Sequence, residues 1–129
     1  VLDPENPLEV VGVLDWEMAT LGDPLMDLGA SLAYWVERDD PPDFQALRMM
    51  PSNVDGAPTR SEVIARYAQK SGLEIGDFSF YSCYGLFRLA VIIQQIYYRY
   101  HHGQTEDPRF KDMHLSVAIL AKAAEAAMK

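Results

Sequence analysis

Four carboxylates at residues 15–27 form the part of the sequence best suited to chemistry. Asp15 and Glu17 follow an apolar run at residues 8–14, and Asp23 and Asp27 come soon after them. A carboxylate at the end of an apolar strand emerges from the core, and a second one two residues on points the same way if the backbone is extended. Such hard oxygen ligands suit Mg²⁺, which takes one or two carboxylates together with phosphate oxygens and water. By spacing alone, a turn residue at a strand end is the commoner explanation for Asp15.

The second pair of carboxylates lies on a predicted helix. Asp23 followed by Pro24 indicates a helix start, because Asp accepts an orphan backbone N–H and Pro suits the first helical position. Asp27 lies between two apolar residues, where a buried free carboxylate would be costly. It either faces solvent or accepts hydrogen bonds from a loop that it holds in place. A weaker alternative is a helical metal enzyme that uses Asp23 and Asp27 as ligands.

The remaining sequence predicts a mainly helical chain. Residues 3–7 read as a turn and residues 8–14 as a strand, one arm of a β-hairpin. We expect the first helix to run from Asp23 through Trp35 to the proline break at residues 39–42, and a loop at residues 49–58. Three more helices are predicted by their start and stop residues: Thr59 with Glu62 (a capping box) to Gly72, Asp77 to Gly103, and Asp107-Pro108 to the Ala-rich end.

Composition excludes several classes of protein. Residues 1–43 carry eleven acidic side chains and one Arg, a formal charge of −10, whereas residues 44–129 sum to +2. No basic stripe is present to displace counterions, so we expect no nucleic-acid partner. No run approaches the roughly 18 uninterrupted apolar residues of a membrane span. The single Cys83 in an apolar stretch indicates a reducing, cytoplasmic compartment.

One sequence pattern resembles a known family. Leu14-Asp15-Trp16-Glu17, Leu21-Gly22-Asp23-Pro24 and Asp27-Leu28-Gly29 are similar to the aminoglycoside phosphotransferase and choline kinase-like family, which has a protein-kinase-like fold. The similarity is greatest to the phosphotransferase domains related to those fused to acyl-CoA dehydrogenases. The resemblance implies ATP and Mg²⁺ as cofactors, with Asp15 as the metal ligand, as in the kinase Asp-Phe-Gly triplet. It further implies that Asp27 steadies the catalytic loop and that Asp23 caps its helix, while Glu17 is the weaker candidate for the metal.

The sequence also departs from that family. His-Gly-Asp, the family's catalytic loop that supplies the base, does not occur, and the Gly-rich phosphate loop and its lysine are absent as well. The resemblance therefore implies that residues 1–129 are the back part of a C-terminal lobe, without the N-terminal lobe and catalytic loop. We expect the intact parent to phosphorylate a hydroxyl of a small molecule (aminoglycoside, choline-like or hydroxyacyl-CoA) and the chain alone to be inactive.

Other residues on the longest predicted helix are candidates for the acceptor pocket, which this helix lines in the family. They are Tyr84, Arg88 and Gln95. Arg88 lies in a run expected to be buried, so it needs either an acidic partner or a wet cleft that binds an anionic substrate. The histidines at 101, 102 and 114 are expected to cap or pack rather than bind metal. The alternative to an enzyme is a helical interaction domain or pseudo-kinase remnant that forms homodimers through exposed apolar surface.

Overall fold

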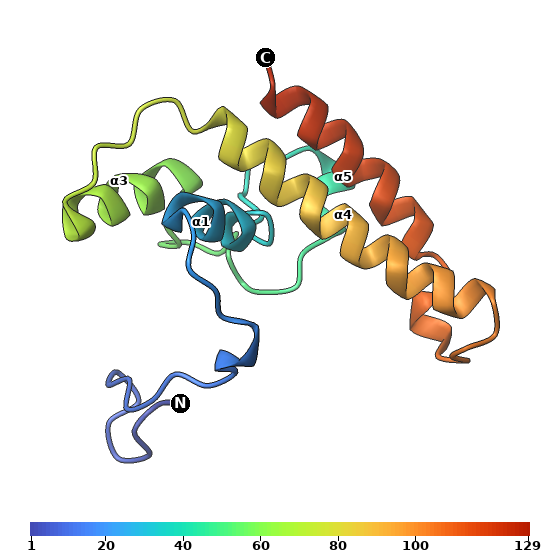
Figure 1. Cartoon of the computed structure of the whole chain (residues 1–129), viewed down its shortest axis with the longest axis horizontal. Helices are drawn as coiled ribbons and strands as arrows, with labels where there is room; N and C mark the ends of the chain where they lie inside the picture. The colour runs from blue at the N-terminus through green and yellow to red at the C-terminus, as the bar shows by residue number, and fades with distance from the viewer.

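Five α-helices make up most of the structure. The computed structural model describes residues 1–129, with only the backbone of Met18. The helices are α1 (Pro24–Leu32), α2 (Pro42–Gln45), α3 (Arg60–Ser71), α4 (Ser79–His101) and α5 (Met113–Ala127), with 3₁₀ turns η1 (Trp16–Met18) and η2 (Pro108–Phe110). Figure 1 shows α5 running back alongside α4, with α1 against α4 and the N-terminal segment reaching away from the helices. The prediction of a mainly α-helical chain is confirmed. No helix described by the structure is long and apolar enough to cross a membrane.

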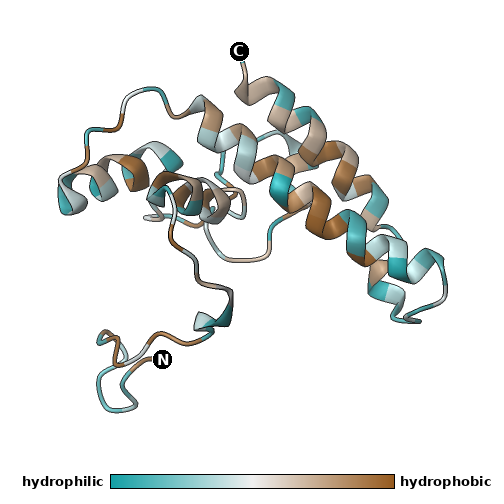
Figure 2. Cartoon of the chain, in the orientation of Figure 1, coloured by the Kyte–Doolittle hydropathy of each residue, from teal (hydrophilic) through white to brown (hydrophobic). Residues whose placement is uncertain are grey.

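The core lies where α4 and α5 pack together. Leu89 and Ile93 of α4 are one turn apart, and they are buried in one cluster with Leu120 of α5, which is 0% exposed. Residues three, four and seven apart share a helix face, so these side chains form apolar stripes that face each other. Figure 2 shows hydrophobic segments, in brown, along both α4 and α5. Val36 and Phe44, from the segment after α1, belong to the same buried cluster.

Helix α1 crosses α4 at two glycines. A Cβ added to Gly85 would lie 2.1 Å from the carbonyl oxygen of Gly29, and one added to Gly29 would lie 2.3 Å from the carbonyl oxygen of Tyr81. Real Cβ atoms do not approach backbone oxygen so closely, so both positions need a residue without a side chain. This backbone contact fixes where the acidic start of α1 lies relative to α4.

The predicted start of α1 is confirmed, but its predicted end is not. Asp23 caps the helix by accepting a 2.9 Å hydrogen bond from the Leu25 N–H. The helix ends at Leu32 instead of continuing through Trp35, because the chain that follows bonds to a distant loop. The Val36 N–H donates to Ser52 Oγ at 3.0 Å, Ser52 Oγ donates back to the Val36 carbonyl at 2.9 Å, and the Trp35 indole N–H donates to the Pro58 carbonyl at 2.8 Å. Side chains that bond backbone groups in this way compete with helix continuation.

The capping box predicted for α3 is confirmed. The Glu62 N–H donates to Thr59 Oγ1 at 3.1 Å, and the Thr59 N–H donates to the Glu62 carboxylate at 2.7 Å. This backbone hydrogen bond, with a second one from the Thr59 hydroxyl, holds the pKa of Glu62 below its usual value. The helix ends at Gly72, which has a left-handed φ of 74°. Helix α2, a single turn after the Pro41-Pro42 pair, was not predicted.

The last two helices form close to where the sequence predicts them, but their first and last residues differ. Asp77 accepts from the Ser79 N–H at 2.9 Å, but the N-cap of α4 is Phe78 rather than Asp77, and the helix ends at His101 rather than Gly103. Asp107 was predicted to open the last helix, but it caps only η2, where it accepts from the Arg109 N–H and pairs with the Arg109 guanidinium. The chain then turns again before α5 begins at Met113.

The predicted strand and hairpin at the N-terminus are wrong. Only an isolated antiparallel bridge joins Leu2 and Val10, and no strand forms in the described residues. Proline has no N–H to donate, and Pro4 and Pro7 both lie in the connecting segment. Asp3 Oδ1 accepts the N–H groups of residues 5 and 6, which tightens the turn further. The apolar run at residues 8–14 therefore makes only a few backbone hydrogen bonds, to residues 1–3, and stays largely exposed.

The capping box gives a test of local stability. Replacing Thr59 with alanine should lower the stability of α3 by about 1 kcal/mol, the usual cost of losing a threonine cap. Native-state hydrogen exchange of the α3 amides should then be roughly fivefold faster. Ser61→Ala is the matched control, since Ser61 is exposed in the same turn and caps nothing. Equal exchange in the two variants would contradict a stabilising role for the Thr59 cap.

Candidate functional site

Asp15 stands on an unusual backbone conformation. Its φ of 71° and ψ of 42° make it the one non-glycine residue with positive φ among those described. Asp tolerates this left-handed region better than most residues, and side chains held in it cluster at functional sites. The 3₁₀ turn η1 follows at once, and the Trp16 indole N–H donates to the Val13 carbonyl at 2.8 Å, which ties the turn together.

The prediction that the Asp15 and Glu17 carboxylates point the same way along an extended strand does not apply here. That argument required an extended backbone, and residues 16–18 form a helical turn instead. Both carboxylates are exposed, and neither hydrogen-bonds nor ion-pairs with any side chain or backbone group that the structure describes. Two unengaged carboxylates on one turn still suit a hard cation that brings its own phosphate and water ligands.

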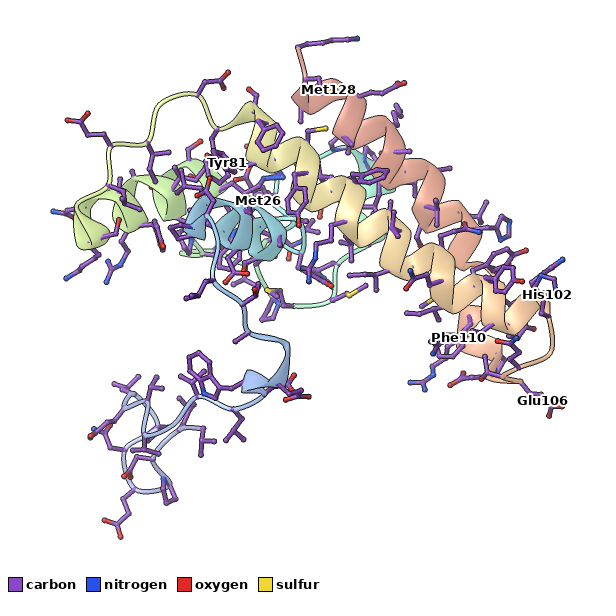
Figure 3. The ribbon with its side chains drawn as sticks, viewed as in Figure 1. Met26, Tyr81, His102, Glu106, Phe110 and Met128 are labelled. Atoms are coloured by element: carbon purple, nitrogen blue, oxygen red, sulfur yellow. The ribbon has the colours of Figure 1, made fainter. Side chains whose placement is uncertain are left out.

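Asp23 links α1 to α4. One carboxylate oxygen caps α1, and the other accepts a 2.8 Å hydrogen bond from the Tyr81 hydroxyl, 58 residues further along the chain. Figure 3 labels Tyr81 in the first turns of α4, where this helix passes α1. The Tyr81 ring also packs against Phe78, with centroids 5.2 Å apart. With both oxygens of Asp23 engaged inside the chain, the reading of Asp23 as a metal ligand has no support in this geometry.

Asp27 lies one turn after Asp23, on the same side of α1. Its side chain is exposed and makes no hydrogen bond or ion pair with the described residues. Of the two readings left open by the sequence, solvent exposure is therefore the one seen in this chain. No group of three or more His, Cys, Asp or Glu side chains gathers as a metal site within the described residues.

The three acceptor-pocket candidates share one face of α4, since positions 84, 88 and 95 are separated by whole turns. Arg88 is exposed and pairs with no acidic side chain that the structure describes, so the expected burial with an acidic partner is wrong. The buried stripe of α4 passes through Leu89 and Ile93, and Arg88 lies outside it. Gln95 lines a groove of about 540 Å³ between α4 and α5, whereas Tyr84 and Arg88 do not line this groove.

Sequence reasoning missed Tyr81 as part of the site. The hydrogen bond to Asp23, together with partial burial and the nearby negative charge, raises the pKa of the Tyr81 phenol above its ordinary value. A group whose pKa is raised on folding stabilises the fold below its unfolded pKa, near 10, and this stabilisation is lost as the pH rises through the folded pKa. The link between α1 and α4 should therefore weaken only in strongly alkaline solution.

The Tyr81 phenol can be tested by its titration. With ¹³Cζ-labelled tyrosine, the NMR signal that disappears in Tyr81→Phe should titrate at higher pH in the unmodified chain than in Asp23→Asn. Removing the Asp23 charge should return the pKa of Tyr81 toward its ordinary value of about 10. Asp27→Asn is the matched control on the same helix and should leave this titration unchanged. A titration that is insensitive to Asp23→Asn would disprove the hydrogen bond.

The sequence of the chain is similar to that of several known proteins. Residues 1–62, which contain all four carboxylates, match the model of the phosphotransferase enzyme family. Mouse acyl-CoA dehydrogenase family member 10 is 38% identical over 106 residues, covering 81% of this chain and 10% of the relative. Mouse family member 11 is 36% identical over 97 residues (73% of this chain, 12% of the relative), and human family member 11 is 32% identical over 123 residues (93% and 15%).

The chain thus spans between a tenth and a sixth of the length of these curated relatives. No solved structure matches it. The resemblance carried by the carboxylate pattern at residues 14–29 is confirmed by these matches. Residues 1–62 thus match the phosphotransferase enzyme family, and the chain is similar to segments of acyl-CoA dehydrogenase family members 10 and 11.

Proposed function

We propose that the polypeptide that carries this chain transfers the γ-phosphoryl group of ATP to a hydroxyl of a small molecule. The observation that carries the proposal is the phosphotransferase match over residues 1–62, a segment that includes all four carboxylates of the site. In this proposal residues 1–129 are part of the C-terminal lobe of a kinase-like fold. The catalytic base and the nucleotide-binding lobe come from outside these residues, so the chain alone is expected to be inactive.

Asp15 is the proposed ligand of the Mg²⁺ that accompanies ATP. Its carboxylate is exposed, lacks a partner among the described residues and stands on a left-handed turn held by the Trp16 indole. Bound Mg²⁺ would neutralise charge on the phosphates as the phosphoryl group transfers. Glu17, in the same turn, is a second and weaker candidate because η1 turns its backbone away from the extended geometry.

Asp23 and Asp27 support the site in this proposal rather than bind metal. Asp23 fixes the start of α1 through its backbone cap and through Tyr81. Asp27 is exposed on the same helix, where its carboxylate can accept hydrogen bonds from a neighbouring loop. The Gly29–Gly85 contact holds α1 against α4, so these two carboxylates keep a fixed relation to the face with Tyr84, Arg88 and Gln95.

The acceptor is proposed to bind along that face of α4. Gln95 offers an amide to a hydroxyl, and the unpaired Arg88 offers a charge to an anionic group. The relatives are acyl-CoA dehydrogenase family members by name, which favours a hydroxyacyl-CoA acceptor over an aminoglycoside or a choline-like alcohol. A phosphate-bearing acyl carrier of this kind would also fit the positive charge of Arg88.

The experiment is a phosphorylation panel with the longest native polypeptide that contains this chain. Radiolabelled ATP and Mg²⁺ are offered with one aminoglycoside, choline and one hydroxyacyl-CoA, and transfer of label to each is measured. We expect Mg²⁺-dependent transfer to the hydroxyacyl-CoA. Arg88→Ala should then raise the KM for this acceptor with little change in the KM for ATP. Absence of transfer to any hydroxyl acceptor, with ATP bound, would overturn the proposal.

One observation favours a second function. Phe80, Phe87 and Tyr98 are 65%, 62% and 55% exposed on one side of α4, which is a large apolar surface for a helix to present to water. A non-catalytic interaction domain would use this surface to form a homodimer. Sedimentation velocity distinguishes the two readings: a monomer that persists on concentration argues against the interaction domain, and dimerisation that Phe87→Ser abolishes argues for it.

A further inference from the structure

All five helices line one cavity of about 370 Å³, which shares no lining residue with the groove that Gln95 lines. Its walls are mainly apolar side chains of α1, α4 and α5, including Leu32, Leu86, Ile119 and Ala123. None of the four carboxylates at residues 15–27 lines it. The cavity is therefore a feature that the phosphotransferase proposal does not use.

The wall that α3 contributes is tied to the rest of the molecule by polar contacts. The Arg60 backbone N–H donates to the Glu37 carboxylate, and the Arg60 guanidinium pairs with Asp40. The guanidinium also lies over the Phe44 ring, 5.7 Å from its centroid. The Trp35 indole fixes the segment just before α3 through the Pro58 carbonyl. These contacts anchor α3 beside the helix pair, so it forms one fixed wall of the cavity, which is partly open to solvent.

The charged side chains at the cavity are already paired with one another. Asp40 pairs with Arg60, and their side chains are only 14% and 28% exposed. Asp43 of α2 pairs with Lys122 of α5 at 3.5 Å across the rim. The lining thus holds two acids and two bases without an uncompensated charge, which disfavours an ionic ligand. It also offers few free partners to water, which needs two to four polar partners to be held in a cavity.

We propose that this cavity binds a compact, uncharged, apolar small molecule. A cavity of 150 Å³ lined by Leu, Ile and Phe takes up benzene, and ligand pockets begin at about 300 Å³. A volume of about 370 Å³ suits a molecule of one or two fused rings or a short branched chain. Filling the cavity restores the dispersion contacts that an empty apolar space forfeits. The ligand would join α3 to the α4–α5 pair and stabilise the fold as it binds.

Indole, a neutral bicyclic molecule, is the probe for the test. Titration calorimetry with the longest native polypeptide containing this chain should show saturable binding of one indole. Ala123→Phe places a ring inside the cavity and should weaken binding at least tenfold. Ala126→Phe, at an exposed position on the cavity rim, disturbs the core less and should weaken binding at least fivefold.

Two variants of the same helix serve as controls. Ala121→Phe fills the groove between α4 and α5, and Ala118→Phe is an exposed change that touches neither space. Both should bind indole within twofold of the unmodified protein. The proposal is overturned if the unmodified protein, with its helical circular dichroism intact, binds no indole. It is also overturned if Ala121→Phe weakens binding while folded Ala123→Phe and Ala126→Phe do not. Phosphoryl transfer enters none of these measurements.

Discussion

Replacing Asp15 with asparagine is expected to lower kcat for phosphoryl transfer by roughly 10²–10³-fold in the polypeptide that carries this chain. This is the usual cost of removing one group that stabilises transition-state charge. Asparagine keeps the size of the side chain and also tolerates the left-handed backbone of this position, so the change isolates the charge. The Mg²⁺ concentration for half-maximal rate should rise as well, because the variant loses a metal ligand.

Two other carboxylate variants test whether the loss of kcat is specific to Asp15. Asp39→Asn removes an exposed carboxylate outside the site and should leave kcat within twofold. Glu17→Gln should lower kcat by less than about tenfold, since one direct metal ligand remains. An Asp15→Asn variant with unchanged kcat and unchanged Mg²⁺ dependence would remove Asp15 from the metal site, whatever the phosphorylation panel shows.

Replacing Gly85 with alanine should lower the free energy of unfolding by about 2 kcal/mol. The new Cβ would lie 2.1 Å from the Gly29 carbonyl oxygen, a backbone atom that cannot rotate away. Forcing α1 from α4 costs about 3 kcal/mol, the upper part of the usual range for overpacking. Alanine regains about 1 kcal/mol of helix propensity over glycine, which offsets part of the clash without cancelling it.

The measurement is urea denaturation, in which the midpoint should fall while the slope stays unchanged. Gly76→Ala is the control, since a Cβ there meets nothing within 4 Å and no positive φ opposes it. This variant should change stability by no more than about 0.5 kcal/mol. A Gly85→Ala protein as stable as the Gly76→Ala protein would show that α1 does not rest on α4 through its backbone.

Helix starts could be read from the sequence because their causes are local. Asp23, Thr59 and Asp77 each satisfy a backbone N–H within three residues of themselves, so spacing alone reveals them. Helix ends are harder to predict when they are set by contacts with residues far along the chain. Helix α1 stops at Leu32 because Ser52 takes the backbone groups of Val36, a contact across 16 residues that no local pattern displays.

The strand predicted at residues 8–14 was wrong for a different reason. Its β-branched residues favour a strand, but a strand needs a partner to satisfy its backbone, and propensity cannot supply one. Residues 1–3 and 9–12 exchange a few backbone hydrogen bonds across the turn, but only Leu2 and Val10 form a β-bridge. Strand propensity therefore describes only what residues 8–14 prefer locally. They form no sheet because they have too few backbone partners.

The sequence by itself determined the acidic cluster at residues 15–27, most helix starts and the similarity to the phosphotransferase enzyme family, because all of these rest on residue types at short spacing. Only the tertiary structure decided which carboxylates are engaged. Tyr81 reaches Asp23 across 58 residues, and Gly85 meets Gly29 across a similar distance, so both contacts depend on how α1 crosses α4. That crossing follows from long-range packing, in which two glycines let the backbones touch. It brings Tyr81 to Asp23, whereas Asp15, Glu17 and Asp27 are exposed without such a contact.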